Sequence, residues 1–461
     1  DECRKQKLCK REDDWQFVRR AYFLAKEVHK GVRRRSGEPY VIHPIEVALI
    51  AVREIGLGKK SVVAALLHDV VEDTDYTVED IARIFSPKIA SMVDGLTKIA
   101  GVFNSQNSEQ AEYFRKVLLT LSDDVRVIII KIADRLHNMR TLGAMPLDKQ
   151  IKITSETIYL FVPLAYRLGL HSIKSELEDL CMKYRFPEEY EDIRRKIEET
   201  EPERQQYIER FMAPIKEVLD RNGFQYEMKA RVKSIYSIWN KMRKQKVPFE
   251  GVFDVFAIRF IIDCEEDRAV EHALCWKVFS YVTEEYESDT KRLRDWISNP
   301  KPNGYESLHI TVKNKEGSFL EVQIRTKRMD DMAESGLASH WSYKGIRHEA
   351  TLDKWLTAVR KALENPLGSE GDPMAAYYED ELMEMPTKEV CVFTPSGELR
   401  KLPAGATVLD FAFDIHTNLG VKCTGGKVNG KAVRINEKLK TGDVVEIMSG
   451  KNQKPSQDWL N

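Results

Sequence analysis

The sequence predicts a multidomain protein in which an all-α domain is followed by an α/β domain and then by a small β-rich module. Apolar residues recur at three- and four-residue spacing through most of residues 13–220, which is typical of amphipathic helices. Strand-like runs begin near residue 252 and return from about residue 388. A chain of 461 residues also exceeds what one hydrophobic core can hold, so its length favours about three domains.

The composition is that of an ordinary globular protein, with 42% hydrophobic and 31% charged residues. No run of about 18 apolar residues is present, which excludes a membrane-spanning helix. The seven cysteines are scattered and never spaced as Cys-x-x-Cys, a pattern that disfavours a disulfide framework and predicts a reducing, cytoplasmic environment. Because the net charge is −1, any anion-binding site must come from local clustering of basic residues.

Within the all-α part, residues 17–25 and 62–67 show the helical spacing most clearly. Residues 125–132 form an apolar, β-branched run that suits either a strand or a buried helix. The run continues directly into residues 133–140, and this continuation favours a helix.

The α/β part is indicated by strand-like runs at residues 252–262, 307–313 and 318–325. Shorter runs at 390–393, around Val433 and at 442–447 indicate the β-rich module. The expected divisions are an all-α domain over 1–180, a helical connector over 181–225, an α/β domain over 226–345, a helical linker over 346–387, the β-rich module over 388–450, and the start of a truncated C-terminal region over 451–461.

Histidines and acidic residues in the all-α part predict a metal site. Imidazole nitrogens and carboxylate oxygens together suit a Mn-, Fe- or Zn-type divalent ion. Helical spacing over residues 64–73 places the ionisable residues on one broad face, and Asp134, Asn138 and Thr141 form a single polar stripe. A lone histidine on a helix is more often structural than a ligand, so the prediction depends on this set taken together: His43, His68, Asp69, Glu72, Asp73 and Asp134.

The segments around these residues resemble the HD-domain phosphohydrolases, and most closely the hydrolase of the RelA/SpoT homologue (Rel) family. The matching segments are residues 34–44, 66–74 and 131–140. The resemblance implies that Mn²⁺ is bound by His43, His68, Asp69 and Asp134. It implies that Glu72 and Asp73 help to activate the attacking water, that Arg34 and Ser36 contact the nucleotide, and that Asn138 and Thr141 lie near its sugar or base. Because Arg33, Arg34 and Arg35 are consecutive, the arginine that contacts the nucleotide could be shifted by one residue from Arg34. The alternative is that these arginines belong to a solvated loop.

A second site is predicted in the α/β part. Residues 228–247 hold seven basic residues and no acidic one, which suggests a polyphosphate or nucleic acid ligand. An apolar stripe in this segment indicates a docked helix with a basic edge. Asp254 and Glu321 are expected on adjacent strands, where two carboxylates would hold Mg²⁺ against a nucleoside triphosphate. An ordinary salt bridge at the edge of a strand is the competing interpretation.

The loop Lys301-Pro-Asn-Gly-Tyr-Glu-Ser-Leu-His, with residues 251–259 and 321–326, resembles the Rel synthetase, a relative of the polymerase-β-like nucleotidyltransferases. The resemblance implies that Asp254 and Glu321 bind Mg²⁺, that Glu321 also deprotonates the acceptor 3′-OH, that Tyr305 stacks on guanine, and that Arg231 packs on adenine. Phosphates and ribose would be arranged by Lys233, Lys241, Lys301, Asn303, His309 and Gln323.

The resemblance implies two opposed reactions in the stringent response. A GTP/GDP pyrophosphokinase moves the β,γ-pyrophosphate of ATP to GDP or GTP, and a (p)ppGpp 3′-pyrophosphohydrolase removes it. Arg292-Leu-Arg-Asp295 resembles the basic form of the loop that accompanies bifunctional members. To avoid a futile cycle we expect opposed conformations, coupled through the helices between about 150 and 225.

The last module, through residues 392–397, 402–412 and 415–420, resembles a TGS domain, a small ubiquitin-like β-grasp. This resemblance implies a sensor of ribosome-bound uncharged tRNA, with His416 near the end of the tRNA; a structural role for His416 in its loop is the alternative. Two other hypotheses remain. One is a ribosome- or tRNA-sensing regulator with only one active catalytic domain, or with none. The other is a general HD nucleotide phosphohydrolase with a nucleotide-binding regulatory domain.

Overall fold

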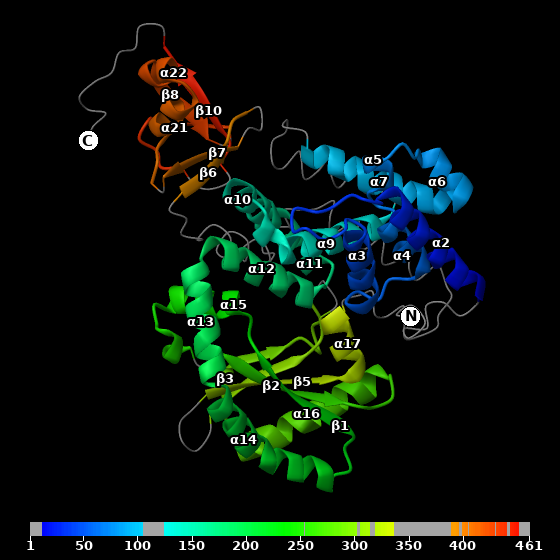
Figure 1. Cartoon of the computed structure of the whole chain (residues 1–461). Helices are drawn as coiled ribbons and strands as arrows, with labels where there is room; N and C mark the ends of the chain where they lie inside the picture. The colour runs from blue at the N-terminus through cyan, green and yellow to red at the C-terminus, as the bar shows by residue number, and fades with distance from the viewer. Residues whose placement is uncertain are drawn as a thin grey trace. The chain divides into compact units, whose positions relative to one another are not determined.

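The computed structural model describes residues 12–104, 124–252, 254–301, 305–313, 319–335, 389–395, 399–403, 405–428, 430–439 and 443–450 (Figure 1). The chain forms two compact units, Asp1–Met92 with Ile128–Trp355 and Val93–Val127 with Leu356–Asn461. The predicted linker over 346–387 and the predicted C-terminal start over 451–461 lie outside the described residues. None of the helices in the described part of the chain combines the length and apolar character needed to cross a bilayer.

The first part of the chain is helical, as predicted. Its helices are α2 (Glu12–Val28), α3 (Ile42–Arg53), α4 (Lys59–Leu66), α5 (Val70–Asp73), α6 (Val78–Ile84), α7 (Pro87–Asn104), α9 (Val125–Arg140), α10 (Leu147–Glu156), the π-helix Thr157–Phe161 and α11 (Val162–Arg167). The ambiguous run at 125–132 is the start of α9, so the helix prediction is confirmed there.

The expected continuous helix over residues 64–73 is wrong. The helix ends at Leu66, and a turn over Leu67, His68 and Asp69 separates α4 from α5. The N–H of Leu67 is shared between the carbonyls of Val63 and Ala64, which tightens the last turn of α4. The break redirects the His68-Asp69 pair relative to the helix that precedes it.

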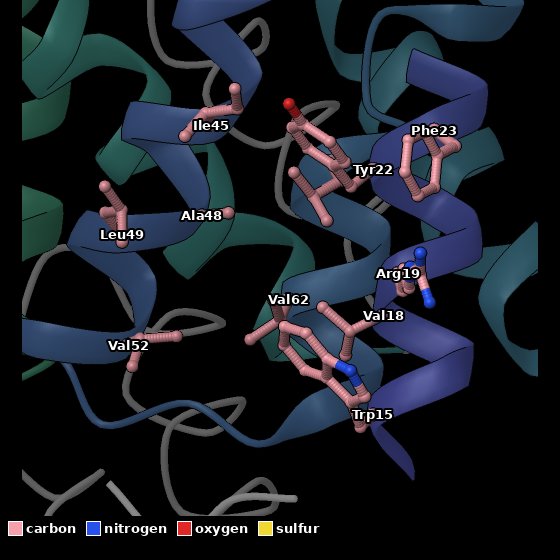
Figure 2. Close-up of a pocket in the computed structure, with 11 residues that line it drawn as sticks. Trp15, Val18, Arg19, Tyr22, Phe23, Ile45, Ala48, Leu49, Val52 and Val62 are labelled. Carbon is pink, nitrogen blue, oxygen red and sulfur yellow. The ribbon is translucent and has the colours of Figure 1, made fainter. Parts of the chain in front are cut away.

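An apolar pocket of about 290 Å³ lies among α2, α3 and α4 (Figure 2). Trp15, Tyr22 and Phe23 line it from α2, and Ile45 and Leu49 line it from α3. Its lining contains no carboxylate and no histidine. Because a metal-dependent reaction on a phosphorylated nucleotide needs such groups, this pocket is separate from the candidate sites below.

Three helices, α12 (His171–Arg185), α13 (Pro187–Glu199) and α14 (Glu201–Arg221), lead to a five-stranded sheet. The sheet has the order β1-β2-β5-β4-β3, and the pair β2–β5 is parallel while the other pairs are antiparallel. Its strands are β1 (Tyr226–Val232), β2 (Phe256–Ile262), β3 (Glu287–Asp295), β4 (Leu308–Lys313) and β5 (Phe319–Thr326), and its helices are α15 (Ile235–Gln245), α16 (Arg268–Glu285) and α17 (Lys327–Ser335).

The two faces of this sheet differ, because successive side chains of a strand point to opposite sides. Alternate residues of β2, β4 and β5, such as Phe260, Ile310 and Val322, form one buried core with apolar residues of α14 and α16. The opposite face carries Arg259, His309 and Glu321, so the chemistry of this domain lies on the face that α14 and α16 leave uncovered.

The sequence suggested that the basic segment over residues 228–247 is one docked helix, and this prediction is wrong. Its first part is strand β1, and only the part from Ile235 onward forms α15, whose N-terminus is capped by the Ser234 hydroxyl. The apolar stripe was therefore assigned correctly, while the basic residues 229, 231 and 233 belong to β1 and the residues beside it. Apolar and charged residues alternate along β1 with the period of a strand and could have indicated it, but its basic residues form one block with those of the following segment, which favoured a single helix.

In the second unit, the described residues between 389 and 450 form a β-grasp-like module. A two-stranded sheet pairs β6 (Glu389–Phe393) with β7 (Leu399–Pro403), and a three-stranded sheet has the order β10-β8-β9, with β8 (Cys423–Val428), β9 (Lys431–Val433) and β10 (Val445–Ser449). The helices α21 (Val408–Ile415) and α22 (Thr417–Val421) accompany them. Val392, Phe411 and Val445 are fully buried in the shared core.

Candidate active sites

Four side chains that the sequence singled out come together among the helices. His43 lies on α3, His68 and Asp69 lie in the turn after α4, and Asp134 lies on α9. The ligand atoms of His43, His68 and Asp69 all lie within 4.8 Å of one another. Asp134 Oδ1 is 3.2 Å from His43 Nε2 and 3.9 Å from His68 Nε2. Two imidazoles and two carboxylates thus face one small volume, as the ligands of a divalent ion do.

The orientation of His68 suits a metal ligand. Its Nδ1 lies 2.8 Å from the carbonyl oxygen of Ala65. A carbonyl only accepts hydrogen bonds, so Nδ1 carries a proton, and Nε2 is the ring nitrogen that can bind a cation once the cation displaces its proton. This Nε2 is buried, has no hydrogen-bond partner among the described residues, and lies 3.1 Å from Asp69 Oδ2. A divalent cation would satisfy the nitrogen and the carboxylate at once.

The electrostatics of this cluster favour a positive charge. Burial alone would raise the pKa of Asp69 and of Asp134, but His68 beside Asp69 and Lys131 beside Asp134 hold both pKa values below the ordinary 3.8. Burial alone would lower the pKa of His68, yet the Asp69 and Asp134 carboxylates raise it to about 9. The two carboxylates therefore remain ionised at neutral pH and attract a cation to the volume between them.

The loop before α3 reaches this cluster through one arginine. Arg34 Nη2 donates to Asn138 Oδ1 at 2.7 Å, and Asn138 Nδ2 donates to Asp134 Oδ1 at 2.7 Å. Arg33 instead donates to the carbonyl of Gly37 within its own loop. Of the consecutive arginines, Arg34 is therefore the one hydrogen-bonded to a side chain of the cluster.

The two hydroxyl residues predicted to contact the nucleotide make local bonds. Ser36 Oγ lies 3.3 Å from Glu38 Oε1 in the same loop. Thr141 Oγ1 donates to the carbonyl of His137 at 3.0 Å, one turn back along α9. Both residues stand near Arg34 or Asn138 in sequence, but these bonds do not join them to the acidic cluster.

Glu72 and Asp73 lie on the short helix α5, directly after the Asp69 turn. The N–H of Asp73 donates to the carbonyl of Asp69 at 2.8 Å, which ties α5 to the turn. Partial desolvation and the nearby carboxylates of Asp69 and Asp73 raise the pKa of Glu72, and a carboxylate with a raised pKa is a stronger proton acceptor. Both residues are exposed, so solvent can reach them.

Sequence reasoning missed three further polar groups at this cluster. Tyr40 Oη donates to Asp69 Oδ2 at 2.8 Å, Lys131 Nζ lies 2.7 Å from Asp134 Oδ2, and His137 Nδ1 lies 2.8 Å from His43 Nδ1. Lys131 and His137 are three residues before and after Asp134 on α9, so helical spacing could have found them. Tyr40 lies in the loop before α3, and only the tertiary fold brings its hydroxyl to Asp69.

In the α/β domain, Asp254 and Glu321 share one lysine. Lys233 Nζ bonds Asp254 Oδ2 and lies 2.8 Å from Glu321 Oε2, and Lys241 pairs with the same oxygen of Asp254. Glu321 is on β5 as predicted, but the strand assignment of Asp254 is wrong: Asp254 lies in a turn, and β2 begins at Phe256. Asp254 still lies near Glu321, because β2 and β5 run parallel and Ala257, three residues after Asp254, is opposite Glu321.

Both carboxylates are held in the ionised form. Burial works against their charge, but Lys233 and Lys241 keep the pKa of Asp254 below its ordinary value, and His309 and Lys233 do the same for the pKa of Glu321. An ammonium group between the two acids shows that this position binds a cation. That arrangement is expected both of a salt bridge and of a metal site, and the test of function below separates them.

The predicted guanine-binding loop lies beside Glu321. Tyr305 Oη lies 2.7 Å from His309 Nε2, and His309 Nδ1 lies 3.2 Å from Glu321 Oε1. Because a carboxylate only accepts, His309 donates from Nδ1 and accepts the tyrosine hydroxyl at Nε2. Lys301 lies 4.1 Å from the ring centroid of Trp296, and Gln323 donates to Glu321 at 2.8 Å. Asn303 lies outside the described residues.

Arg231, the predicted adenine contact, lies in a group of arginines that the sequence did not reveal. Arg231, Arg259 and Arg325 all lie within 3.5 Å of Glu334 Oε1 on α17. Arg259 and Arg325 are buried, and the Nε of each has no hydrogen-bond partner among the described residues. Charged residues at alternate positions of otherwise apolar strands could have indicated them.

Helix α12 contacts elements of both domains within the first unit. At the end of α9, Arg140 pairs with Glu176 of α12 at 2.6 Å. The ring of His171, at the start of α12, lies 5.5 Å from the ring of Tyr305 in an edge-to-face contact. The predicted coupling between the two sites through residues 150–225 stays a prediction, and these are two of the contacts that α12 makes with the two domains.

Asp179 of α12 caps the N-terminus of α15. Its carboxylate accepts the N–H of Tyr236 at 2.8 Å and of Ile235 at 3.3 Å. Burial raises its pKa from the ordinary 3.8 to about 6, because desolvation outweighs these hydrogen bonds. Since the raised pKa lies in the folded state, the stability that Asp179 contributes is present below about pH 4 and is lost as the pH rises to about 6.

We therefore expect the free energy of unfolding of the wild type, relative to that of Asp179→Asn, to fall by on the order of 2 kcal/mol between pH 4 and pH 7. Urea denaturation at both pH values measures this difference. A difference that does not change with pH would show that the Asp179 carboxylate is not desolvated.

In the second unit, His416 has a structural role. Its Nδ1 accepts the N–H of Asn418 at 3.1 Å and so caps the N-terminus of α22. This contact supports the alternative left open by the sequence, that His416 has a structural role in its loop.

Comparisons with known proteins agree with this arrangement. Family models match in chain order: an HD domain at residues 21–171, the region found in RelA / SpoT proteins at residues 230–348, and a TGS domain at residues 390–449. An HD hydrolase domain uses a divalent metal, which fits the donor set of His43, His68 and Asp69.

Among curated proteins, the chain is 41% identical to a guanosine-3′,5′-bis(diphosphate) 3′-pyrophosphohydrolase of Aquifex aeolicus, over 96% of this chain and 62% of that protein. It is 40% identical to a GTP pyrophosphokinase of Myxococcus xanthus, over 97% of this chain and 58% of that protein. It is 37% identical to the bifunctional (p)ppGpp synthase/hydrolase SpoT of Escherichia coli K12, over 98% of this chain and 63% of that protein. The chain spans about three fifths of the length of these relatives.

Three matching domains in the same order, and relatives at 37–41% identity over nearly the whole chain, agree with the two clusters of acidic residues described above. The chain belongs to the RelA/SpoT homologue family.

Proposed function

We propose that this chain is a bifunctional alarmone enzyme. Its α/β domain would transfer pyrophosphate from ATP to the 3′-OH of GDP or GTP and release AMP, and its HD domain would hydrolyse the 3′-pyrophosphate of the product. The observation that carries this proposal is the presence of two separate acidic clusters in one chain, one among helices and one on a sheet, each built to hold a cation.

In the HD domain, the proposed Mn²⁺ ligands are His43, His68, Asp69 and Asp134. A divalent ion bound there would lower the pKa of water and offset phosphate charge. Glu72, whose pKa is raised by partial desolvation and nearby carboxylates, and Asp73 would accept the proton of the attacking water. Arg34 and Asn138, already hydrogen-bonded to each other, would hold the nucleotide, with Ser36 and Thr141 nearby.

In the α/β domain, Asp254 and Glu321 would bind Mg²⁺, with Glu321 also accepting the proton of the 3′-OH. This requires Lys233 to leave its position between the acids and to pair with phosphate oxygens, for which an ammonium is suited. Tyr305 would stack on guanine and Arg231 on adenine. Lys241, Lys301, Asn303, His309 and Gln323 would complete the phosphate and ribose contacts.

The TGS domain would contact uncharged tRNA on the ribosome. An alternative is a regulator with only one active catalytic domain. One observation favours it: the Tyr305 ring, which should receive the guanine, is in edge-to-face contact with His171 and with Trp296.

Two separate incubations test the proposal. The first combines the protein with ATP, GDP and Mg²⁺, and the second combines it with guanosine 3′-pyrophosphate 5′-diphosphate and Mn²⁺. We expect AMP and the pyrophosphorylated nucleotide in the first, GDP and pyrophosphate in the second, and neither product after chelation of the metals by EDTA. Product in only one of the two would support the single-activity alternative, and product in neither would contradict both.

A further inference from the structure

His137 contacts both a histidine of the proposed metal site and a positively charged side chain. It lies on α9, is 6% exposed, and packs its ring against His43 with ring centroids 4.9 Å apart. Its Nδ1 lies 2.8 Å from Nδ1 of His43 and 3.0 Å from Nη1 of Arg34. Both contacts converge on a single nitrogen atom.

The chemistry of these groups decides where the protons lie. A guanidinium has five N–H donors and no acceptor, so Arg34 donates to His137 Nδ1, and this nitrogen carries a lone pair and no proton. Two unprotonated ring nitrogens would repel each other at 2.8 Å, so His43 Nδ1 supplies the proton between them. With Nδ1 holding its proton, Nε2 is the nitrogen of His43 that offers a lone pair when a cation displaces the proton it shares with Asp134.

His43 Nε2 is the atom that faces the acidic cluster, at 3.2 Å from Asp134 Oδ1 and 3.7 Å from Asp69 Oδ2. For His68 the same selection is made by a backbone carbonyl, since Ala65 accepts from its Nδ1. His137 takes the place of such a carbonyl at His43, and Arg34 makes His137 an acceptor.

We propose that His137 is a positioning residue, which selects the tautomer of His43 so that Nε2 is available to a divalent cation, with Arg34 fixing the direction of the hydrogen bond. This inference rests on the proposed hydrolase site. It also makes Arg34 contribute to metal affinity, through His137, in addition to its proposed contact with the nucleotide.

The test measures Mn²⁺ affinity without any substrate. The metal-free full chain, carrying Asp254→Asn to remove the second proposed cation site, is titrated with Mn²⁺, and free Mn²⁺ is followed by electron paramagnetic resonance. His137→Phe keeps a planar ring but removes the acceptor, and we expect its Mn²⁺ affinity to fall about 10- to 100-fold, as when other partners of metal-bound histidines are removed. His137→Asn places an amide oxygen where Nδ1 was. Its Mn²⁺ affinity should stay within about 3-fold of the wild type, a much smaller change than that expected for His137→Phe.

A further pair of variants tests the role of Arg34. Arg34→Met should weaken Mn²⁺ binding less than His137→Phe, because His137 can then still accept in one of its tautomers. In the His137→Phe background, Arg34→Met should cause no further loss, since the two residues act through one hydrogen bond. An additive loss would overturn the proposed sequence of contacts.

Two results would contradict the proposal itself. Unchanged affinity in His137→Phe would show that the hydrogen bond does not matter, and equal losses in the Phe and Asn variants would show that only the shape of the imidazole matters. If the Phe variant does not fold, long-range ¹H–¹⁵N NMR of histidine-labelled wild-type protein loaded with a diamagnetic divalent ion such as Zn²⁺ decides the matter, because the absence of a proton on His43 Nδ1 would refute it. Failure of the hydrolase site as a whole is distinguishable, because the wild type would then bind Mn²⁺ no better than Asp69→Ala.

Discussion

Asp69→Asn is expected to lower the rate of 3′-pyrophosphate hydrolysis at least about 100-fold while leaving the ATP-dependent synthesis unchanged, because removing even an indirect partner of a bound metal costs 10- to 100-fold. The Asp69 carboxylate lies 3.1 Å from His68 Nε2 and 3.7 Å from His43 Nε2, so it contacts both imidazoles of the cluster. Asparagine has nearly the same size and can still accept the hydrogen bond of Tyr40. The substitution therefore removes the charge and leaves the packing.

The loss should appear in the release of pyrophosphate from the 3′-pyrophosphorylated nucleotide with Mn²⁺ present, and in a weaker Mn²⁺ affinity. Asp148→Asn is the matched control, since Asp148 is an exposed carboxylate in the first turn of α10 and lies outside the cluster. If Asp69→Asn reduced hydrolysis and synthesis to the same extent, the effect would be a loss of folding, and the assignment of Asp69 would fail.

Asp254→Asn is expected to have the complementary effect, a loss of synthesis of at least about 100-fold with hydrolysis unchanged, as expected when a charge that holds a catalytic metal is removed. Asp254 shares Lys233 with Glu321 and also binds Lys241, so one carboxylate here organises two cations. Its loss would leave Glu321 to hold Mg²⁺ alone beside two lysines.

The measurement is AMP formation from ATP and GDP with Mg²⁺. Asp263→Asn is the matched control, because Asp263 is an exposed carboxylate just after the other end of β2. The salt-bridge interpretation makes the opposite prediction: Asp254→Asn would then lower the thermal stability of the chain and leave synthesis within about 2-fold of the wild type, since removing the charge of a surface ion pair typically changes stability by less than 1 kcal/mol.

The sequence predicted much of the helical site because the relevant spacing is local. Asp134 and Asn138 are one helical turn apart on α9, and the structure joins them by a hydrogen bond of 2.7 Å. The apolar residues of the same segment favoured a helix, and α9 is one. The alternation along β5, with Val322 and Ile324 on one face and Glu321 and Gln323 on the other, was equally readable, because the period of a strand is two residues.

Errors arose where a backbone change has no strong local signal. The turn at Leu67–Asp69 interrupts a segment with good helical spacing, and Asp254 lies in a turn although the residues around it are aromatic and aliphatic. Strand β1 was missed although apolar and charged residues alternate along it, because its basic residues run on into those of α15 and the whole segment was assigned to one helix.

The sequence by itself determined which residue types are present for the two chemistries, and on which helices and strands most of them lie. Only the tertiary structure decided which donor meets which acceptor: Arg34 rather than Arg33 reaches Asn138, His137 turns its Nδ1 to His43, and Lys233 stands between Asp254 and Glu321. The physical reason is that periodicity constrains neighbours within one element. Hydrogen bonds and ion pairs between elements depend instead on distances of about 3 Å, which are fixed only when separate helices and strands pack together.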